Sequence, residues 1–354
     1  MAAIERGSTV LVTGACGFIG SHVCEALVPR GIRVIGVDNF DPFYDESLKR
    51  ANLAAVRSFG ERGGAPFAAM LSKDLPGFPG GGLSGSFTFI EADIADAPAM
   101  SRVFGEHTPS AVVHLAAKAG VRPSIEDPSG YATANVLGTQ VVLEAARAAG
   151  CERFVMASSS SVYGNNTKVP FSEDDDVSFP ISPYAATKRA CELIAHTHHH
   201  LTDMPTACLR FFTVFGPRQR PDLAISKFLR LVSSGEPLRM FGDGSTSRDY
   251  TYIADIVAGV CAALDRIPDY GYRIWNLGHS EPVSLREMIA TIERVVGREA
   301  DIRQEPMQPG DVERTNADLS RAGAELEFRP TTSFEDGVTL QWRWMQKQAR
   351  AANG

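Results

Sequence analysis

The chain has 354 residues, a net charge of −7, 44% hydrophobic residues and 22% charged residues. This composition is ordinary for a globular protein, and the length allows two domains or one large one. The negative charge gives no indication of a nucleic-acid or anionic-membrane partner. We find no signal peptide and no apolar run long enough to span a bilayer, so we expect a cytoplasmic protein.

Six cysteines show no paired short spacing, which favours small core residues in a reducing compartment over disulfides or a zinc site. Two other segments resemble metal ligands, His198–His200 and Glu173–Asp176. Consecutive helical positions do not face one point, and no carboxylate pattern accompanies the histidines. We interpret both segments as solvated surface and expect no metal site.

The first predicted element is a buried strand over residues 9–13, and a glycine-spaced turn follows it directly. Gly14, Gly17 and Gly20 have the spacing Gly-x-x-Gly-x-x-Gly, and a helix is predicted over Ser21–Pro29. Glycines allow a tight turn and close approach of the backbone to a pyrophosphate, and a helix N-terminus supplies amide donors. The segment therefore predicts a dinucleotide-binding turn.

The second predicted strand, residues 33–37, ends at Asp38, about 20 residues after the turn, as dinucleotide sites require. A carboxylate at this place accepts hydrogen bonds from both ribose hydroxyls and repels a 2′-phosphate. No arginine follows Asp38 immediately. We therefore expect NAD rather than NADP.

Two further strand ends suit the same ligand. The strand over 87–91 leads to Asp93 and Ile94, which suit an adenine, and the strand over 111–115 leads to small residues that let a dinucleotide lie across the strand tips. His114 stands inside the latter apolar strand, where a satisfied core histidine is the favoured interpretation.

The alternation of strands and helices predicts an α/β fold with a Rossmann-type, doubly wound parallel sheet. A later strand over Arg273–Leu277 is a candidate for the same sheet, and Gly60–Ser86 reads as a long, flexible, glycine-rich inserted loop. We expect an NAD-binding domain over 1–215 plus about 252–280. A smaller, mixed α/β domain for substrate is expected over 216–251 plus 281–350.

The hydroxyl-rich run Ser158–Tyr163 and the pattern Tyr184-x-x-x-Lys188 carry the chemistry. A free phenol loses its proton only near pH 10. A lysine four residues later on a helix lies on the same face, and its positive charge favours the phenolate. A serine hydroxyl can hold the same substrate oxygen. The pattern therefore predicts proton transfer at an alcohol carbon.

These segments together resemble the nucleotide-sugar 4-epimerases of the extended short-chain dehydrogenase/reductase family, above all the UDP-glucuronate 4-epimerases. The resemblance covers nearly the whole chain apart from residues 60–86. It is carried, besides the stretches above, by the segments 17–22, 114–122, 158–165, 209–218, 241–244, 248–252 and 306–312.

The resemblance implies an isomerase in which Tyr184 is the acid/base, Lys188 holds the nicotinamide ribose and Ser159 contacts the reacting oxygen. UDP-glucuronate would become UDP-galacturonate through a transient 4-keto sugar, with hydride returned from NAD to the opposite face. It also implies a homodimer in which helices near 135–149 and 184–202 pack against their mates.

The cofactor positions expected from the motifs and the resemblance are Gly14, Gly17, Phe18, Ile19, Gly20, Asp38, Asn39, Asp93, Ile94, Leu115, Ala116, Ala117, Lys118, Asn135, Ser158, Tyr184, Lys188 and Phe211. The substrate positions are Ser159, Ser160, Ser161, Thr213, Arg218, Arg220, Lys227, Phe241, Arg248 and Asp311. Arginine suits a diphosphate because its guanidinium grips oxygens in a fork, and Phe241 is suited to stack on uracil.

Other interpretations stay open at this stage. Arg218 and Arg220 could be solvated loop charges, and Arg248 with Asp249 a surface ion pair of little energetic value. The substrate could be UDP-glucose or UDP-N-acetylglucosamine, and a non-catalytic NAD sensor is the alternative of another class.

A UDP-glucuronate decarboxylase is less favoured. Related dehydratases and decarboxylases carry a carboxylate where this chain has Ser161, and neither Ser160 nor Ser161 supplies one. We hypothesise that Ser159, Ser160, Ser161 and Thr213, with Arg220, hold the glucuronate carboxylate so that the 4-keto sugar keeps its CO₂.

Overall fold

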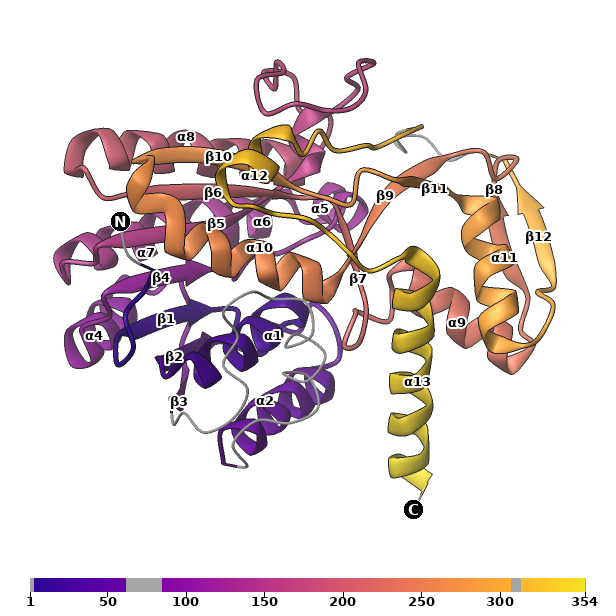
Figure 1. Ribbon diagram of the computed structural model, residues 1–354, viewed down its shortest axis with the longest axis horizontal. Helices are drawn as coiled ribbons and strands as arrows, with labels where there is room; N and C mark the ends of the chain where they lie inside the picture. The colour runs from indigo at the N-terminus through magenta and orange to yellow at the C-terminus, as the bar shows by residue number, and fades with distance from the viewer. Residues whose placement is uncertain (1–2, 62–84, 307–312, 354) are drawn as a thin grey trace.

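The computed structural model describes residues 3–61, 85–306 and 313–353 (Figure 1). Its main sheet has seven parallel strands in the order β10-β6-β5-β4-β1-β2-β3. The strands span Thr9–Thr13 (β1), Arg33–Asp38 (β2), Ser86–Glu91 (β3), Ala111–His114 (β4), Arg153–Ser159 (β5), Thr206–Phe211 (β6) and Tyr272–Leu277 (β10). The doubly wound parallel sheet is thus confirmed, and the candidate strand over 273–277 forms its edge beside β6.

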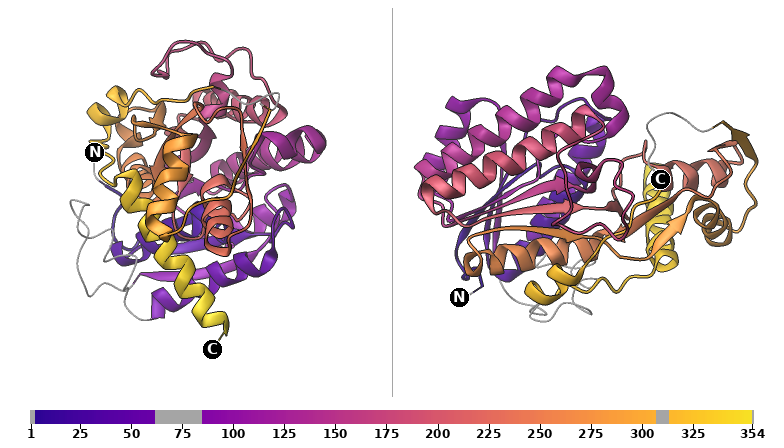
Figure 2. Two further views of the ribbon diagram at one scale, coloured as in Figure 1. Left: turned by 90° about the vertical axis from the view of Figure 1, so that its right-hand side faces the viewer. Right: turned by 90° about the horizontal axis from the view of Figure 1, so that it is seen from above.

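Helices cover both faces of this sheet (Figures 1 and 2). One face carries α1 (Phe18–Leu27), α2 (Glu46–Glu61) and α10 (Ile253–Arg266), and the other carries α4 (Ala97–His107), α7 (Gly138–Ala148) and α8 (Pro183–Thr202). Side chains alternate between the faces, since Val10 and Val12 join the core under α1 and α10 whereas Leu11 joins the core under α7. Because both faces are buried, the strands read as continuous apolar runs.

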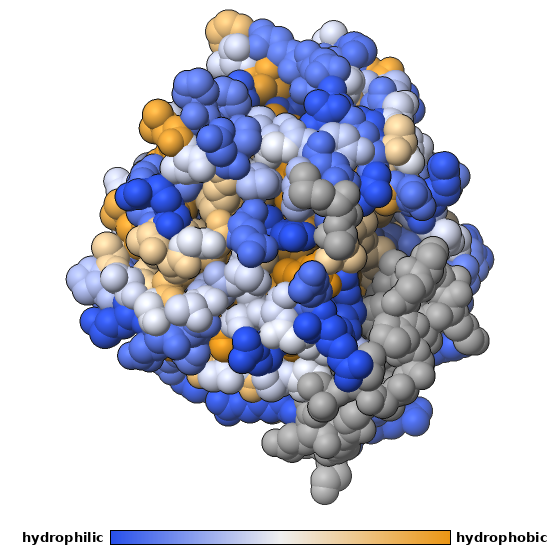
Figure 3. Space-filling model, turned by 60° about the vertical axis from the view of Figure 1, so that its left-hand side comes forward, coloured by the Kyte–Doolittle hydropathy of each residue, from blue (hydrophilic) through white to orange (hydrophobic). Residues whose placement is uncertain are grey.

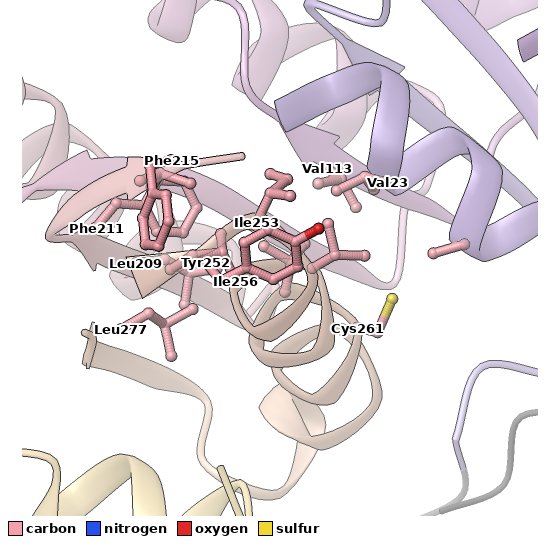
Figure 4. Close-up of a cluster of buried hydrophobic side chains, with 14 of the residues drawn as sticks. Val23, Val113, Leu209, Phe211, Phe215, Tyr252, Ile253, Ile256, Cys261 and Leu277 are labelled. Carbon is pink, nitrogen blue, oxygen red and sulfur yellow. The ribbon is translucent and has the colours of Figure 1, made fainter. Parts of the chain in front are cut away.

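The core beneath α10 fixes the strands that lead to the site. Figure 4 shows Leu209 of β6 and Val113 of β4 converging with Val23 of α1 on Ile253 and Ile256 of α10. All five side chains are fully buried. The ends of the central strands are therefore set by packing rather than by loops.

Short helices connect these elements. They are η1 (Val28–Arg30), α5 (Val121–Glu126), α6 (Pro128–Tyr131), the π-helix η2 (Ala132–Leu137), η3 (Ser160–Tyr163) and η4 (Ile267–Asp269). The helix predicted over 21–29 begins earlier, at Phe18, because Gly17 with its extended backbone is already the N-cap. The predicted loop over 60–86 falls almost wholly on residues 62–84, which lie outside the described residues.

Smaller elements lie beyond the carboxyl ends of the main sheet (Figure 1). Two small sheets have the orders β11-β9-β7 and β12-β8. Their strands span Thr213–Phe215 (β7), Leu238–Phe241 (β8), Ser247–Tyr252 (β9), Pro282–Ser284 (β11) and Ile302–Glu305 (β12). The accompanying helices are α9 (Ala224–Ser234), α11 (Leu285–Val296) and α13 (Phe334–Asn353), whereas α12 (Ser320–Glu325) packs beside β10 of the main sheet (Figure 1).

The surface shown in Figure 3 is mostly hydrophilic, with hydrophobic residues scattered over it. All six cysteines are buried and free, as predicted. None of the described helices is long and apolar enough to cross a membrane, and the described residues hold no cluster of side chains suited to a metal ion.

The two predicted solvated segments are in part buried. His198 packs against the neighbouring helix and is 6% exposed, and Glu173 is 8% exposed with its carboxylate accepting the Asn276 backbone N–H at 2.8 Å. Both interpretations were therefore wrong at these residues, because long-range packing decides burial where the local pattern is polar throughout.

His114 is a core histidine, as predicted. Its Nδ1 lies 2.8 Å from the Thr13 hydroxyl and its Nε2 lies 3.1 Å from the Thr139 hydroxyl, with 3% of the residue exposed. Burial, assisted by the charge of Lys188, lowers the pKa of His114 from 6.5 to about 3. The ring is therefore neutral at physiological pH.

We expect His114 to make the fold acid-sensitive. Below pH 6.5 the unfolded chain gains a proton that the buried ring refuses, so the free energy of unfolding falls as pH drops from 6.5 toward 3. The contribution is at most about 1.4 kcal/mol per pH unit. Urea unfolding between pH 7 and 4 measures how steeply the free energy of unfolding changes with pH. This pH dependence should be smaller in His114→Gln than in wild type, whereas the exposed-site variant His200→Gln should keep the wild-type dependence. Equal slopes in all three proteins would contradict this assignment.

Candidate active site

The glycine turn after β1 is closely packed. Gly14 has φ +69°, and a Cβ placed there would lie 2.8 Å from the Ala116 backbone nitrogen. A Cβ on Gly20 would lie 2.0 Å from the Gly14 carbonyl oxygen. No side chain caps the N-terminus of α1, where Gly17 is the N-cap. First-turn amides without a capping side chain, at the carboxyl edge of a parallel sheet, fit a diphosphate.

Asp38 ends β2 beside this turn. Its two carboxylate oxygens accept the backbone N–H groups of Cys16 at 3.0 Å and Phe40 at 2.9 Å. A carboxylate has about four acceptor positions, so room remains for ribose hydroxyls. Next to it, Asn39 donates to the Asp93 carboxylate at 3.0 Å and ties the segment after β2 to the segment after β3. Ile94 is buried one residue further on.

The segment after β4 is held by polar contacts from two sides. The Thr13 hydroxyl accepts the N–H groups of Leu115 and Ala116, both at 3.1 Å. The Asn135 amide accepts the Lys118 N–H at 2.8 Å, donates to the Lys118 carbonyl at 3.0 Å and also donates to the Thr187 hydroxyl at 3.0 Å. The side chain of Asn135, a predicted cofactor position, thus makes three hydrogen bonds that shape this loop.

The Lys118 side chain is also engaged, since its ammonium contacts the Asp127 carboxylate at 2.8 Å. Residues 115–118, which include Ala117, are half-buried. The segment thus presents backbone and small side chains, rather than charged ones, at the strand tips.

Tyr184 and Lys188 lie on the first two turns of α8. Ser182 caps this helix by accepting the Ala185 N–H at 3.1 Å, and Pro183 is its first residue. Lys188 is 5% exposed and its ammonium donates to the Ala157 carbonyl of β5 at 2.8 Å. The predicted motif is thereby anchored against the strand that carries the serines.

Ser159 ends β5 and is the N-cap of η3. Its hydroxyl accepts the N–H of Ser161 at 3.2 Å and the Ser161 hydroxyl at 3.0 Å. Ser159, Ser160, Ser161 and Tyr184 are all half-buried, so a ligand can reach them. The arrangement brings a phenol, an ammonium and a serine hydroxyl to the carboxyl end of the sheet.

The sequence did not indicate Tyr131 as a residue of the site. Its ring packs edge-on against Tyr184, with centroids 6.1 Å apart, and against Phe43 at 6.4 Å. Its hydroxyl is buried and has no hydrogen-bond partner among the described residues. An orphaned buried donor beside Tyr184 fits a site that a bound ligand completes. Position 131 carried no motif that would have revealed this.

Two predicted ligand side chains face the interior. The Ser158 hydroxyl donates to the buried Glu192 carboxylate at 2.6 Å, and Ser158 is 2% exposed. Phe211 is 8% exposed and points into the core under α10 (Figure 4). Alternation along β5 and β6 explains both, since neighbouring residues face opposite sides of the sheet. Only the backbone of these two residues remains for a cofactor.

The two predicted arginines differ. Arg218, with φ +66°, forms an ion pair of 2.6 Å with Glu25 of α1, a residue 2% exposed. Arg218 is therefore held against α1 behind the glycine turn, and its role as a substrate contact stays a prediction. Arg220 donates to the Ala119 carbonyl at 3.0 Å and lies over the Phe43 ring at 4.6 Å. It thus stands beside the segment after β4.

The remaining substrate positions lie on the smaller sheets and their helices. Phe241 ends β8, and the Arg122 guanidinium lies 5.9 Å from its ring centroid. Thr213 begins β7 and is half-buried, whereas Lys227 of α9 is exposed. Asp311 lies outside the described residues.

Arg248 and Asp249 do not form the surface ion pair considered above. Arg248 donates to the Ser247 carbonyl at 2.9 Å. Asp249 is fully buried and accepts the N–H groups of His279, Ser280 and Ala317 at 2.7 to 2.9 Å. Arg248 therefore keeps a half-buried guanidinium near β9 that a ligand can approach.

The glycine turn gives the first test of this site. We expect Gly20→Ala to weaken NAD binding by about 10-fold or more, because its Cβ would displace the Gly14 carbonyl. The matched control is Gly105→Ala in α4, where a Cβ meets nothing within 4 Å and should stabilise the helix by about 0.5–1 kcal/mol. Titration of each purified variant with NAD, followed by calorimetry, measures the difference. Equal affinities in the two variants would count against a dinucleotide at this turn.

Known proteins resemble the chain over most of its length. A UDP-glucuronate 4-epimerase of Thermodesulfobacterium geofontis is 38% identical, over 95% of this chain and 96% of its own. A probable UDP-glucuronate 4-epimerase of Rhizobium meliloti is 36% identical, over 97% and 98%. The solved structure of a Bacillus cereus UDP-glucuronic acid 4-epimerase with UDP-glucuronic acid and NAD superimposes with a TM-score of 0.82 at 34% identity, covering 96% of this chain and 99% of that one.

A family model describes the same region that builds the site. The model of the NAD dependent epimerase/dehydratase family matches residues 10–278, which include the glycine turn, the serine segment and the Tyr-x-x-x-Lys helix. Since this match covers more than half of the chain, the protein belongs to the NAD dependent epimerase/dehydratase family.

Proposed function

We propose that this protein is an NAD-dependent UDP-sugar 4-epimerase that interconverts UDP-glucuronate and UDP-galacturonate. The observation that carries the proposal is the convergence of Ser159, Tyr184 and Lys188 at the sheet edge that bears the glycine turn. The names of the relatives and the ligands of the Bacillus cereus structure support the same substrate class.

The chain's own residues perform proton transfer in this proposal. NAD, when bound, supplies the nicotinamide that exchanges hydride with C4. Tyr184 takes the proton from the O4 hydroxyl and later returns it, and Ser159 holds the same oxygen. Lys188, tied to the Ala157 carbonyl, would place its positive charge on the helix face that carries Tyr184. Tyr184 and Ser159 are half-buried, so both can stay beside the sugar while it turns its other face to the nicotinamide.

The proposed cofactor contacts follow from the described geometry. The turn from Gly14 to Gly20 would hold the diphosphate, Asp38 the adenosine ribose, and Asp93 with Ile94 the adenine. The segment Leu115–Lys118 would line the strand tips, shaped by Asn135. Lys188 would hold the nicotinamide ribose.

A glucuronate carboxylate raises a chemical problem. The 4-keto sugar is a β-keto acid that loses CO₂ when the C5–C6 bond aligns with the ketone. We propose that the hydroxyls of Ser159–Ser161 and Thr213, with Arg220, hold the carboxylate out of that alignment. The half-buried exposure of all five residues supports this role. The absence of a carboxylate at Ser160 and Ser161 disfavours dedicated decarboxylation.

The diphosphate and base would bind across the smaller sheets. We propose Arg248 and Lys227 for phosphate oxygens, Phe241 for the uracil and Asp311 as a further contact. Residues 1–215 plus about 252–280 would then form the NAD domain, and 216–251 plus 281–350 the nucleotide-sugar domain.

The six buried free thiols suit a reducing compartment, which supports a cytoplasmic location.

We also propose a homodimer through the helical face of α7 and α8. Leu193 and Leu201 of α8 are 53% and 75% exposed, and Leu137 just before α7 is 49% exposed. Figure 2 shows both helices on the same side of the main sheet. A second copy of this face would bury these leucines in a four-helix arrangement.

Incubation with UDP-glucuronate, followed by NMR of the anomeric protons, tests the reaction. We expect UDP-galacturonate without added reductant, and we expect Tyr184→Phe to lower kcat by about 10³-fold while retaining NAD, since the phenol carries the proton. UDP-xylose as product would show that carboxylate control fails. Turnover of UDP-glucose or UDP-N-acetylglucosamine alone would favour the neutral-sugar alternative, and full activity of Tyr184→Phe would refute the mechanism.

Sedimentation velocity at micromolar concentration tests the dimer. We expect wild type to sediment as a dimer and the double variant Leu193→Asp/Leu201→Asp as a monomer, because two carboxylates cannot be buried unpaired in the interface. Ile302→Asp in β12, 43% exposed and away from α8, is the matched control and should remain dimeric. A monomeric wild type removes the proposal.

A further inference from the structure

A buried carboxylate follows the proposed proton-transfer residues on the same helix. Glu192 of α8 is fully buried and comes four residues after Lys188 and eight after Tyr184. Residues at these spacings lie on one helix face. The face of α8 that presents Tyr184 and Lys188 to the sheet therefore also carries the buried carboxylate of Glu192, one turn further along the helix.

Glu192 joins α8 to two strands. Arg210 of β6, which is 1% exposed, donates from Nε to one carboxylate oxygen at 2.9 Å and from Nη2 to the other at 3.0 Å. The Ser158 hydroxyl of β5 donates to the first oxygen at 2.6 Å. Arg189, on the solvent side, donates to the second oxygen at 3.0 Å. The carboxylate thus ties the helix to β5 and β6 at once.

A second chain of contacts runs from Arg210 to the end of η3. Arg210 donates from Nη1 to the Tyr163 hydroxyl at 3.1 Å, and this hydroxyl donates to the Asn276 amide oxygen of β10 at 2.6 Å. Ser158 precedes the half-buried serines 159–161, and Tyr163 follows them. Arg210 therefore reaches one end of the serine segment directly, at Tyr163, and the other end through Glu192, at Ser158.

The charges of this network are well satisfied. Burial alone would raise the pKa of Glu192, but the hydrogen bonds and charge of Arg210 outweigh it and hold that pKa below its ordinary value. A buried ion pair stabilises a fold no better than well-packed apolar residues of similar volume. The hydrogen bonds of such a pair are directional, so they fix the elements that they join in one relative position.

We infer that Glu192 and Arg210 are positioning residues, which fix the end of β5 through Ser158 and so set Ser159 against Tyr184 and Lys188 on α8. The inference rests on the proposed function, because it assigns the network to the geometry of proton transfer. An error of about 1 Å in such geometry can cost about 100-fold in rate.

Ser158→Ala tests this coupling without breaking the ion pair. It removes the one side-chain hydrogen bond between Glu192 and β5. At saturating NAD we expect kcat to fall about 10-fold or more, with KM within about 2-fold of wild type, because ground-state binding is kept while transition-state geometry is lost. The NAD affinity and the thermal midpoint are measured beside it.

Arg189→Gln is the matched control. It also removes one hydrogen bond to Glu192, but Arg189 lies on α8 itself and does not reach β5. We expect its kcat to stay within about 2-fold of wild type, since the strand remains tethered.

Three results would overturn the inference. They are a wild-type kcat in Ser158→Ala, a loss confined to KM or to NAD affinity, and an equal loss of kcat in Arg189→Gln. Each leaves epimerisation by wild type intact and so separates this inference from the proposed function. A wild type inactive on every UDP-sugar would instead overturn the proposed function, and this inference with it.

Discussion

One hydroxyl links the two parts of the cofactor edge, and the rest of the site depends on it. The Thr13 side chain, fully buried at the end of β1, accepts two N–H groups of the segment after β4 and contacts His114. These bonds bring the segment after β4 against the Gly14 turn, where a Cβ would already touch Ala116. Close approach of two backbones requires both glycine and an internal acceptor. Neither the turn nor the loop would keep its place without the other.

The sequence predicted well what depends on neighbouring residues. Apolar β-branched runs identified the strands, because a parallel sheet covered on both faces needs side chains that are apolar at every position. The glycine spacing, the carboxylate at Asp38 and the Tyr184–Lys188 spacing are likewise local patterns. Each of them lies where its pattern placed it, at the carboxyl edge of the sheet.

What could not be predicted depends on partners far apart in the chain. The ion pair of Arg218 with Glu25, 193 residues away, had no local signal in the sequence. Ser158 was predicted as a cofactor position, but the alternation of a strand directs its hydroxyl to Glu192. One signal was available, since Glu192 follows Lys188 by one helical turn and a charged Arg210 interrupts an apolar strand. A lone charge in a buried element implies a partner, though not which one.

The two arginines of one motif show how burial divides structural from ligand-binding roles. Arg218 is paired with a carboxylate that is 2% exposed, and removal of either partner would leave a charge without solvent. Arg220 is paired with Asp222, which is 53% exposed, so this pair is worth little and the carboxylate is readily solvated when the arginine leaves. Separating the Arg220 ion pair therefore costs less than separating the Arg218 ion pair. The same distinction applies to the Glu192–Arg210 pair under α8, in which both side chains are buried.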